Sequence, residues 1–303
     1  MRFAIWVATE QPWQDAAGTA RLADAAGWDA IYLADHFMPN EQPAGLGPRL
    51  EAWTALGALA AITERARLGV LVSGNTYRHP AVLANMAATT DVISGGRLVL
   101  GLGAGWQISE HDAYGIDLPE PPERLARMEE ACKVVRLLLT QERSDFEGRY
   151  YRLADAPCEP KPIQARLPLL LGTSGEKLGM KIAARQADIW NCWGTPETMA
   201  AKLRVLDAHC ESVGRDPATL ERSTQVQLRM SDDPSLLAQW RAGETRNPSI
   251  VGTPNEIGAA LSEYERLGLH EFVVPDRMLG RDTAERRDTM ERFLTEVAAP
   301  FRS

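Results

Sequence analysis

Two short segments stand at the ends of predicted strands and hold residue types that can do chemistry. Asp35 and His36 follow the apolar run 30–34, and the glycine-rich segment 101–105 follows the run 97–100. An imidazole can donate a hydrogen bond or take up a proton near neutral pH, and glycines let a ligand approach the backbone closely. Together they would suit a large flat cofactor. A structural histidine bonded to backbone and an ordinary tight turn are the alternatives.

The carboxylate of Asp35 could fix the tautomer of the neighbouring His36, although adjacent residues on an extended chain point apart. The segment 172–177, Gly-Thr-Ser-Gly-Glu-Lys, joins a predicted strand to a helix. Its free backbone N–H groups and hydroxyls could hold a phosphate, or could form a simple helix N-cap. The polar segment 73–80 could hydrogen-bond a cofactor ring or cap the helix that Pro80 begins.

Tryptophans recur near the predicted strand ends, where aromatic walls would suit a planar ligand. They are Trp6, Trp106, Trp190 and Trp193, with Trp53 after the long second loop. Core packing is the alternative for some of them. The scattered histidines His111, His209 and His270 lack metal-ligand spacing, and neither an HExxH nor a CxxC motif occurs, so we expect no metal site.

The order of elements predicts a (β/α)8 barrel with a small inserted β-hairpin. Strand patterns and helical patterns alternate almost throughout the chain. The strands are expected at 2–8, 29–34, 67–73, 97–102, 168–172, 187–192, 223–230 and 270–275, and the helices at 14–27, 51–64, 80–94, 121–140, 176–186, 195–213, 254–267 and 282–298. Aromatic residues flank Glu147-Gly148, which favours a hairpin outside the barrel. A doubly wound sheet is the rival arrangement.

Length and composition favour one domain over residues 1–303, with 45% apolar residues available for a core. A net charge of −8 without a basic stripe argues against a nucleic-acid partner. No apolar run is long enough to cross a membrane, and the first residues read directly as a strand rather than as a signal peptide. The four cysteines show no paired spacing, so we expect a reduced, cytoplasmic protein.

Four segments together make the chain resemble the bacterial luciferase-like oxidoreductases, and most closely their deazaflavin (coenzyme F420)-dependent branch. The segments are Ala34–Phe37, Asn75–Ala81, Ser94–Trp106 and Phe146–Tyr151. The resemblance covers roughly residues 1–300. It implies a (β/α)8 barrel, often dimeric, with a deazaflavin or flavin ring at the carboxyl-terminal rim, and a small-molecule substrate.

The resemblance also implies roles for individual residues. His36 and Asp35 match the catalytic or cofactor-contacting pair. A non-prolyl cis peptide behind the ring would fall within residues 71–73. The cofactor-binding positions would be Asp35, His36, Leu71, Val72, Ser73, Asn75, Gly103, Ala104, Gly105, Gly172, Thr173, Ser174, Gly175 and Glu176.

One position departs from the family pattern. The sugar-phosphate dehydrogenases of this branch carry an acidic proton donor directly after the glycine segment, where this chain has Trp106. Glu110, four residues on, is not an obvious replacement. We therefore expect a rather apolar substrate, walled by Trp6, Trp53, Trp106 and Trp193.

Three functions remain open on the sequence. The first is a coenzyme F420-dependent oxidoreductase that transfers a hydride between the cofactor and an organic substrate. The second is an FMN-dependent monooxygenase, in which reduced flavin binds oxygen. The third is a barrel that carries a flavin without catalysis, which the Asp35–His36 pair disfavours.

Overall fold

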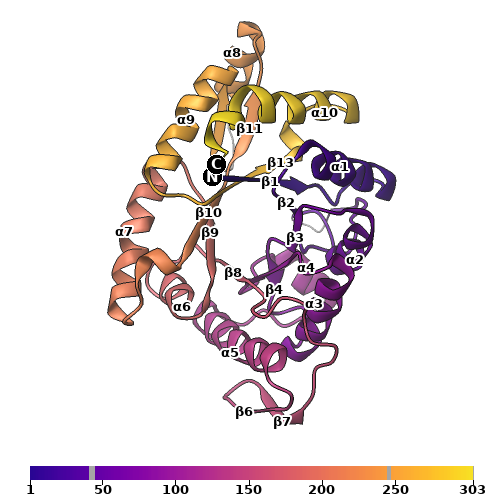
Figure 1. The fold of residues 1–303 in the computed structure, drawn as a ribbon, viewed down its shortest axis with the longest axis vertical. Coiled ribbons are helices and arrows are strands. Elements are labelled where there is room, and N and C mark those ends of the chain that lie inside the picture. Colours follow the sequence, from indigo (N-terminus) through magenta and orange to yellow (C-terminus); the bar gives the residue numbers. More distant parts are fainter. Residues whose placement is uncertain (41–44, 244–246, 303) are drawn as a thin grey trace.

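The carboxyl-terminal ends of parallel strands meet at one rim of a closed barrel (Figure 1). The computed structural model describes residues 1–40, 45–243 and 247–302. In chain order the barrel strands are β1 (Arg2–Val7), β2 (Ala30–Leu33), β3 (Arg67–Val70) with β4 (Ser73–Gly74), β5 (Leu98–Gly103), β8 (Leu169–Gly172), β9 (Ile189–Trp193), β10 (Glu221–Gln225) and β13 (Glu271–Pro275). β3 and β4 share the third of eight strand positions, on either side of a cis peptide between Leu71 and Val72.

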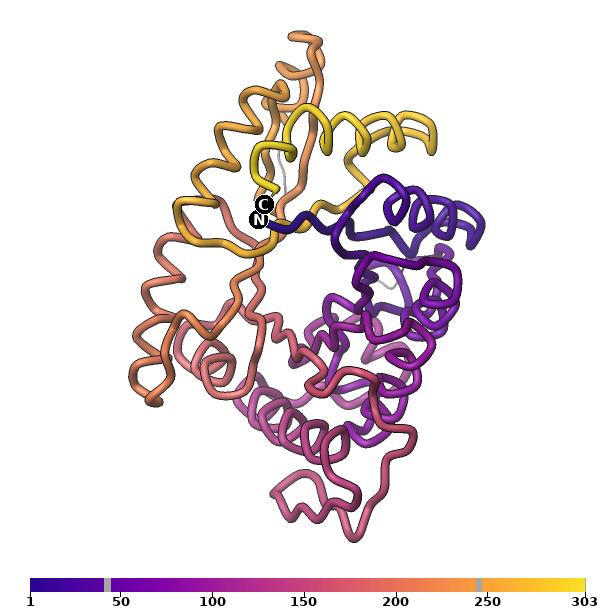
Figure 2. The backbone as a smooth tube through the Cα atoms, viewed as in Figure 1, coloured from indigo at the N-terminus to yellow at the C-terminus, as the bar shows by residue number. Residues whose placement is uncertain are grey.

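Closure of the sheet excludes the doubly wound alternative. β1 pairs in parallel with both β2 and β13, which are the second and the last strands of the barrel. The chain ends meet there too, because the amino group of Met1 donates a hydrogen bond of 2.6 Å to the carbonyl oxygen of Phe301 (Figure 2). The predicted (β/α)8 barrel is confirmed.

Helices cover the outside of the barrel, as Figure 1 shows. They are α1 (Trp13–Ala26), α2 (Ala52–Ile62), α3 (Pro80–Ser94), α5 (Pro121–Thr140), α6 (Gly179–Gln186), α7 (Pro196–Ser212), α9 (Pro254–Arg266) and α10 (Thr283–Arg292), the last followed by a π-helical turn, Phe293–Ala298. Short 3-10 turns lie at Pro217–Thr219, Asp276–Met278 and Ala299–Phe301. None of the helices in the described ranges is both long enough and apolar enough to cross a membrane.

Two separate apolar clusters fill the space inside and outside the strands. The outer cluster packs the helices on the barrel, for example through Met128 and Val135 of α5. The smaller inner cluster plugs the barrel itself and includes Tyr32, Leu71 and Val99. The barrel is therefore a packed core, and a ligand must bind at its rim.

Two additions extend from the barrel. The antiparallel hairpin of β6 (Ser144–Glu147) and β7 (Arg152–Ala156) lies beside α5, as the sequence predicts (Figure 1). The second addition corrects the predicted strand 223–230, which divides after Gln225. Its second half, β11 (Gln227–Met230), pairs in parallel with β12 (Ser249–Gly252). The helix α8 (Pro234–Ala242) lies between these two strands in the chain. Both halves contain buried residues, so the pattern alone does not show where the chain leaves the barrel.

Candidate functional site

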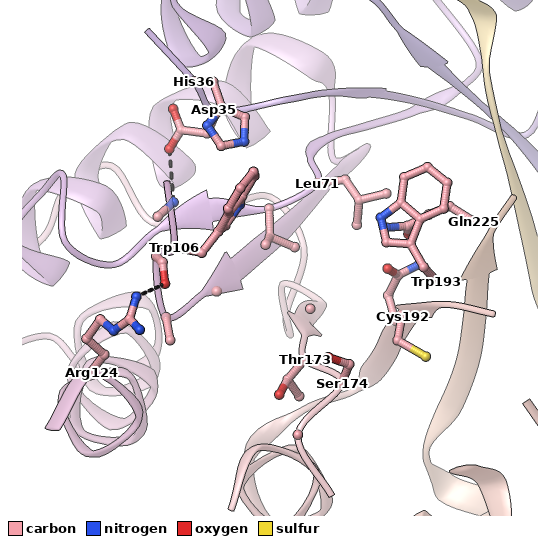
Figure 3. A pocket seen from close by; sticks show the side chains of 18 of the residues that line it. Asp35, His36, Leu71, Trp106, Arg124, Thr173, Ser174, Cys192, Trp193 and Gln225 are labelled. Atoms are coloured by element: carbon pink, nitrogen blue, oxygen red, sulfur yellow. Dashed lines mark hydrogen bonds between the residues drawn. The ribbon is translucent and has the colours of Figure 1, made fainter. Parts of the chain in front are cut away.

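A pocket of about 810 Å³ opens at the carboxyl-terminal ends of the barrel strands. This is within the size range of small-molecule and cofactor sites. Most of its wall comes from residues at or just beyond strand ends, namely Trp6, Asp35, His36, Leu71, Val72, Gly74, Gly103, Ala104, Gly105, Trp106, Gly172, Thr173, Ser174, Gly175, Asn191, Cys192, Trp193 and Gln225. The close view in Figure 3 places His36 beside Trp106 and sets Trp193 with Gln225 on the other side of Leu71.

His36 is held by a carboxylate, and that carboxylate is Glu110. The Nδ1 atom of His36 lies 2.7 Å from Oε1 of Glu110, whose side chain is fully buried. Glu110 also accepts hydrogen bonds from the Phe37 backbone N–H at 2.8 Å and from the Tyr77 hydroxyl. The edge of the Trp106 ring meets the imidazole, with centroids 5.3 Å apart. The arrangement fixes the ring plane of His36 at the pocket wall.

The charge on Glu110 determines which nitrogen of His36 is free. Burial by itself raises the pKa of the Glu110 carboxyl, but the hydrogen bonds from His36, Phe37 and Tyr77 outweigh it, so the pKa lies below its ordinary value. A carboxylate can only accept, so Nδ1 of His36 carries the proton of this hydrogen bond. Nε2 is then the basic nitrogen of the neutral ring. A histidine oriented by a buried carboxylate is the arrangement that general bases use.

Sequence reasoning discounted Glu110 because it looked for an acid directly after the glycines. The structure contains a short helix there that the sequence analysis missed, α4 (Ile108–Tyr114). Its first turn brings Ser109, Glu110 and His111 inward, all of them buried. The buried residues of this helix are polar, and the helix is too short to show a helical period. The sequence therefore has no apolar pattern that would predict it.

Among the hydrogen bonds of the described residues, none joins Asp35 to the imidazole of His36, so Asp35 does not fix its tautomer, a possibility that the sequence left open. The Asp35 carboxylate instead accepts two hydrogen bonds from the Arg78 guanidinium, at 2.6 and 3.0 Å, and one from the Gly74 backbone at 3.1 Å. Burial raises the pKa of Asp35 despite these bonds. Arg78 also pairs with Glu51 at the start of α2. Asp35 therefore ties the second barrel strand to the third and to α2.

The glycine-rich strand end serves a purpose that the sequence analysis did not foresee. A Cβ on Gly103 would lie 2.6 Å from Cγ2 of Val72, and one on Gly172 would lie 2.9 Å from Cγ1 of the same residue. The two glycines thus make room for Val72, which lies directly after the cis peptide expected within residues 71–73. Val72 and Leu71 both line the pocket, so this part of the wall is apolar.

Several predicted contacts lie behind the wall rather than on it. Trp53 is 3% exposed and donates from its indole nitrogen to the Ser73 hydroxyl at 2.9 Å. Asn75 is also buried and donates to the hydroxyl of Tyr151. Glu176 faces solvent, beside Lys202. None of these residues lines the described pocket, so Trp53 is not a substrate wall, whereas Trp6, Trp106 and Trp193 do line it.

Arg124, in the first helical turn of α5, also lines the pocket. Its Nη1 donates to the Gly105 carbonyl at 2.7 Å, and its Nε is buried without a hydrogen-bond partner. Among the ion pairs of the described residues, none involves Arg124. Thr173, Ser174 and Gly175 lie on the same pocket wall, after the neighbouring strand β8. A guanidinium without a counter-ion and a hydroxyl-bearing loop are together suited to an anionic group.

Comparison with known proteins places the chain in a family. The model of the luciferase-like monooxygenases matches residues 1–243. The chain belongs to this family. Among its luciferase-like relatives, the F420-dependent glucose-6-phosphate dehydrogenase of Microbacterium testaceum is 35% identical over 280 residues, 91% of this chain and 78% of the relative. The enzyme of that name from Kineococcus radiotolerans is 34% identical over 217 residues, covering 70% of this chain and 63% of the relative.

Solved structures share the fold over essentially the whole chain. The coenzyme F420-dependent tetrahydromethanopterin reductase of Methanopyrus kandleri superposes with a TM-score of 0.83 at 19% identity, covering 99% of each chain. A monooxygenase from Streptomyces bottropensis gives 0.85 at 22% identity, with both chains fully covered. At such identities the likeness concerns the fold, and both F420-dependent and monooxygenase chemistry occur on it.

Proposed function

We propose that the protein is a coenzyme F420-dependent oxidoreductase that interconverts an alcohol and a carbonyl compound. The observation that carries the proposal is the His36–Glu110 pair on the pocket wall, because removing a hydride from an alcohol carbon also requires a base for the hydroxyl proton. The names of the relatives, F420-dependent glucose-6-phosphate dehydrogenases, support both the cofactor and the substrate type.

The pocket residues fit such a cofactor. Leu71 and Val72 supply an apolar surface for a flat ring, and Gly103, Ala104 and Gly105 line the pocket beside it. Arg124, whose Nε is an orphaned buried donor, and the loop 173–175 would hold the anionic tail. When bound, the deazaflavin accepts or donates the hydride.

The residues of this chain would handle the proton. As the hydride leaves the alcohol carbon, Nε2 of His36 takes the hydroxyl proton and the C–O bond becomes a carbonyl. The buried Glu110 carboxylate, 2.7 Å from Nδ1, stabilises the resulting imidazolium. Trp106 contacts the imidazole edge-on and helps to fix its orientation. In the reverse direction His36 returns the proton to the carbonyl oxygen.

The substrate is better described as hydroxylated than as apolar. The pocket wall beyond Leu71 combines Trp6 and Trp193 with the amides of Asn191 and Gln225, and the relatives act on a sugar phosphate. Aromatic faces with amide groups between them suit a polyol or sugar. Glucose 6-phosphate is therefore the first substrate to test.

The test is a fluorescence titration of the purified protein with F420 and with FMN, followed by turnover of glucose 6-phosphate. We expect F420 to bind in the micromolar range and FMN more weakly. Binding of FMN alone would favour the monooxygenase that the sequence left open. In the enzyme loaded with F420, H36A should lower turnover by roughly 10²-fold or more. Its melting temperature should stay close to that of the wild type, because Glu110 keeps two other donors.

A further inference from the structure

Gln225 is the last residue of β10 and lines the pocket beside Trp193, its register partner on β9 (Figure 3). The residue is only 6% exposed. The Oε1 atom is buried and has no hydrogen-bond partner. Buried amide oxygens without a partner are rare, and each calls for an explanation.

Ser223, deeper in the barrel on the same strand, shows how a buried polar side chain finds hydrogen-bond partners in this part of the molecule. Ser223 lies two positions earlier on β10 and therefore faces the same side of the strand. It accepts a hydrogen bond from Nδ2 of Asn191 at 2.9 Å and donates one to Glu271 at 3.0 Å. The amide of Asn191, which also lines the pocket, thus has a partner in Ser223, whereas the amide oxygen of Gln225 has none among the described residues.

We infer that Gln225 is a specificity-determining residue, whose carboxamide accepts a hydrogen bond from a hydroxyl group of the substrate. This inference rests on the proposed function and names its substrate class: a compound with a second hydroxyl besides the one that is oxidised. The pocket between Gln225 and His36 then binds one hydroxyl at each end, with Trp6 and Trp193 packing against the carbon skeleton.

The position of Gln225 separates this role from cofactor binding. The proposed cofactor contacts come from the ends of β3, β5 and β8, whereas Gln225 lies on β10, which pairs with β9 and β13. Trp6, at the end of β1, lies 5.8 Å from Trp193 between ring centroids. The two tryptophans and Gln225 thus form a wall built from strands that carry none of the proposed cofactor contacts.

The test compares wild type with Q225M, which keeps the side-chain length and removes the acceptor. Hexane-1,6-diol and hexan-1-ol form one probe pair, and glucose 6-phosphate and its 4-deoxy analogue form another; in each pair the hydroxyl that varies is remote from the one that is oxidised. For each pair, kcat/KM and binding by calorimetry are measured with the cofactor that the protein holds. We expect wild type to favour the more hydroxylated member by about tenfold, and Q225M to bring the ratio to near one.

Stability gives a second readout, with a matched glutamine as control. The amide of Gln107 is buried too, but it donates to the Met38 carbonyl at 3.2 Å. Q107M should therefore lower the denaturation midpoint, whereas Q225M should leave it unchanged or raise it, since an unpartnered amide is lost. A lower midpoint for Q225M would assign Gln225 a structural role and overturn the inference.

The remaining outcomes separate the inference from the proposed function. An unchanged hydroxyl preference in Q225M, or no binding of either probe pair to wild type, would overturn the role of Gln225 while leaving F420 binding intact. A loss of F420 affinity in Q225M with the preference retained would assign the amide to the cofactor, and overturn it as well. Failure of wild type to bind F420, with the preference present in the FMN-loaded protein, would overturn the proposed cofactor alone.

Discussion

Replacing Glu110 with glutamine tests the His36–Glu110 pair most directly. The carboxylate accepts from His36 Nδ1, from the Phe37 backbone and from the Tyr77 hydroxyl. A glutamine has one acceptor oxygen and one donor NH₂ group. If its oxygen faces His36, its NH₂ group meets the Phe37 N–H; in the opposite orientation, the NH₂ group meets the His36 ring. In the first orientation the Phe37 N–H loses its acceptor; in the second the Tyr77 hydroxyl loses its acceptor, and His36 must change tautomer to stay paired.

The expected loss of folding stability follows from the one donor that is left without an acceptor. One buried donor without a partner costs about 1–3 kcal/mol, which denaturant unfolding can resolve. The cost to activity is larger. A glutamine NH₂ group that faces His36 forces the proton onto Nε2, so the ring cannot take a proton from the substrate, and loss of the negative charge removes the stabilisation of the imidazolium. We expect kcat to fall by roughly 10²–10⁴-fold.

The pH dependence supplies an internal check. The folded pKa of Glu110 lies below its ordinary value of 4.5, so the folded protein prefers the ionised form. The stabilisation is complete above the unfolded pKa and is lost as the pH falls through the folded pKa. The stability difference between wild type and E110Q should therefore be full at pH 7 and shrink below about pH 4.5.

Y77F is the matched control for E110Q. It removes one donor to the carboxylate but keeps the charge and the His36 hydrogen bond, so its kcat should fall far less than that of E110Q. A folded E110Q with a kcat within about threefold of wild type would refute the reasoning, as would a stability difference that does not change between pH 7 and pH 3.

Three further predictions concern stability and assembly. Burial raises the pKa of Asp276 from 3.8 to about 6, so the folded state holds this proton more tightly and stability falls as the pH rises through this interval. D276N, which can still accept from the Ala8 backbone, should remove that slope in unfolding curves and stabilise the protein at pH 7 by about 3 kcal/mol; a retained slope would contradict this. G103A should destabilise by about 1–3 kcal/mol, because its Cβ would lie 2.6 Å from Val72, whereas G175A meets nothing within 4 Å and should be neutral. Light scattering should show a homodimer rather than a 33.3 kDa monomer.

The fold could be predicted because most of its elements have clear periods and clear ends. The predicted helices 80–94 and 121–140 coincide with α3 and α5, each of which begins with a proline. Most of the barrel strands are short apolar runs, and turns or helices separate them; β10, with the sequence ERSTQ, is polar throughout. The exception lies after Gln225, where the polypeptide leaves one sheet and joins another without any change in residue pattern.

The candidate site was predictable only where its residues lie at strand ends. Asp35, His36 and the glycines are there because parallel strands bring their carboxyl ends to one rim. The partner of His36 is not at a strand end: it is 74 positions away on a helix of seven residues. The sequence places Asp35 next to His36, but neighbouring side chains on an extended segment point to opposite faces. Asp35 therefore pairs with Arg78, and the imidazole bonds to Glu110 instead.

Asp35 is thus adjacent to His36 in sequence but does not bond to it in the described part of the chain, whereas Glu110 is distant in sequence and does. The two carboxylates therefore have separate roles. Asp35, paired with Arg78 and bonded to the Gly74 backbone, holds the second and third strands together at the pocket wall. Glu110, which pairs with no lysine or arginine among the ion pairs of the described residues, keeps its charge for the imidazole. Substitution of Asp35 should therefore disturb the fold and the cofactor wall, whereas substitution of Glu110 should act first on proton transfer. The same reasoning explains how the position after the glycines can hold Trp106: the negative charge of the site comes from α4, one helical turn further along the chain.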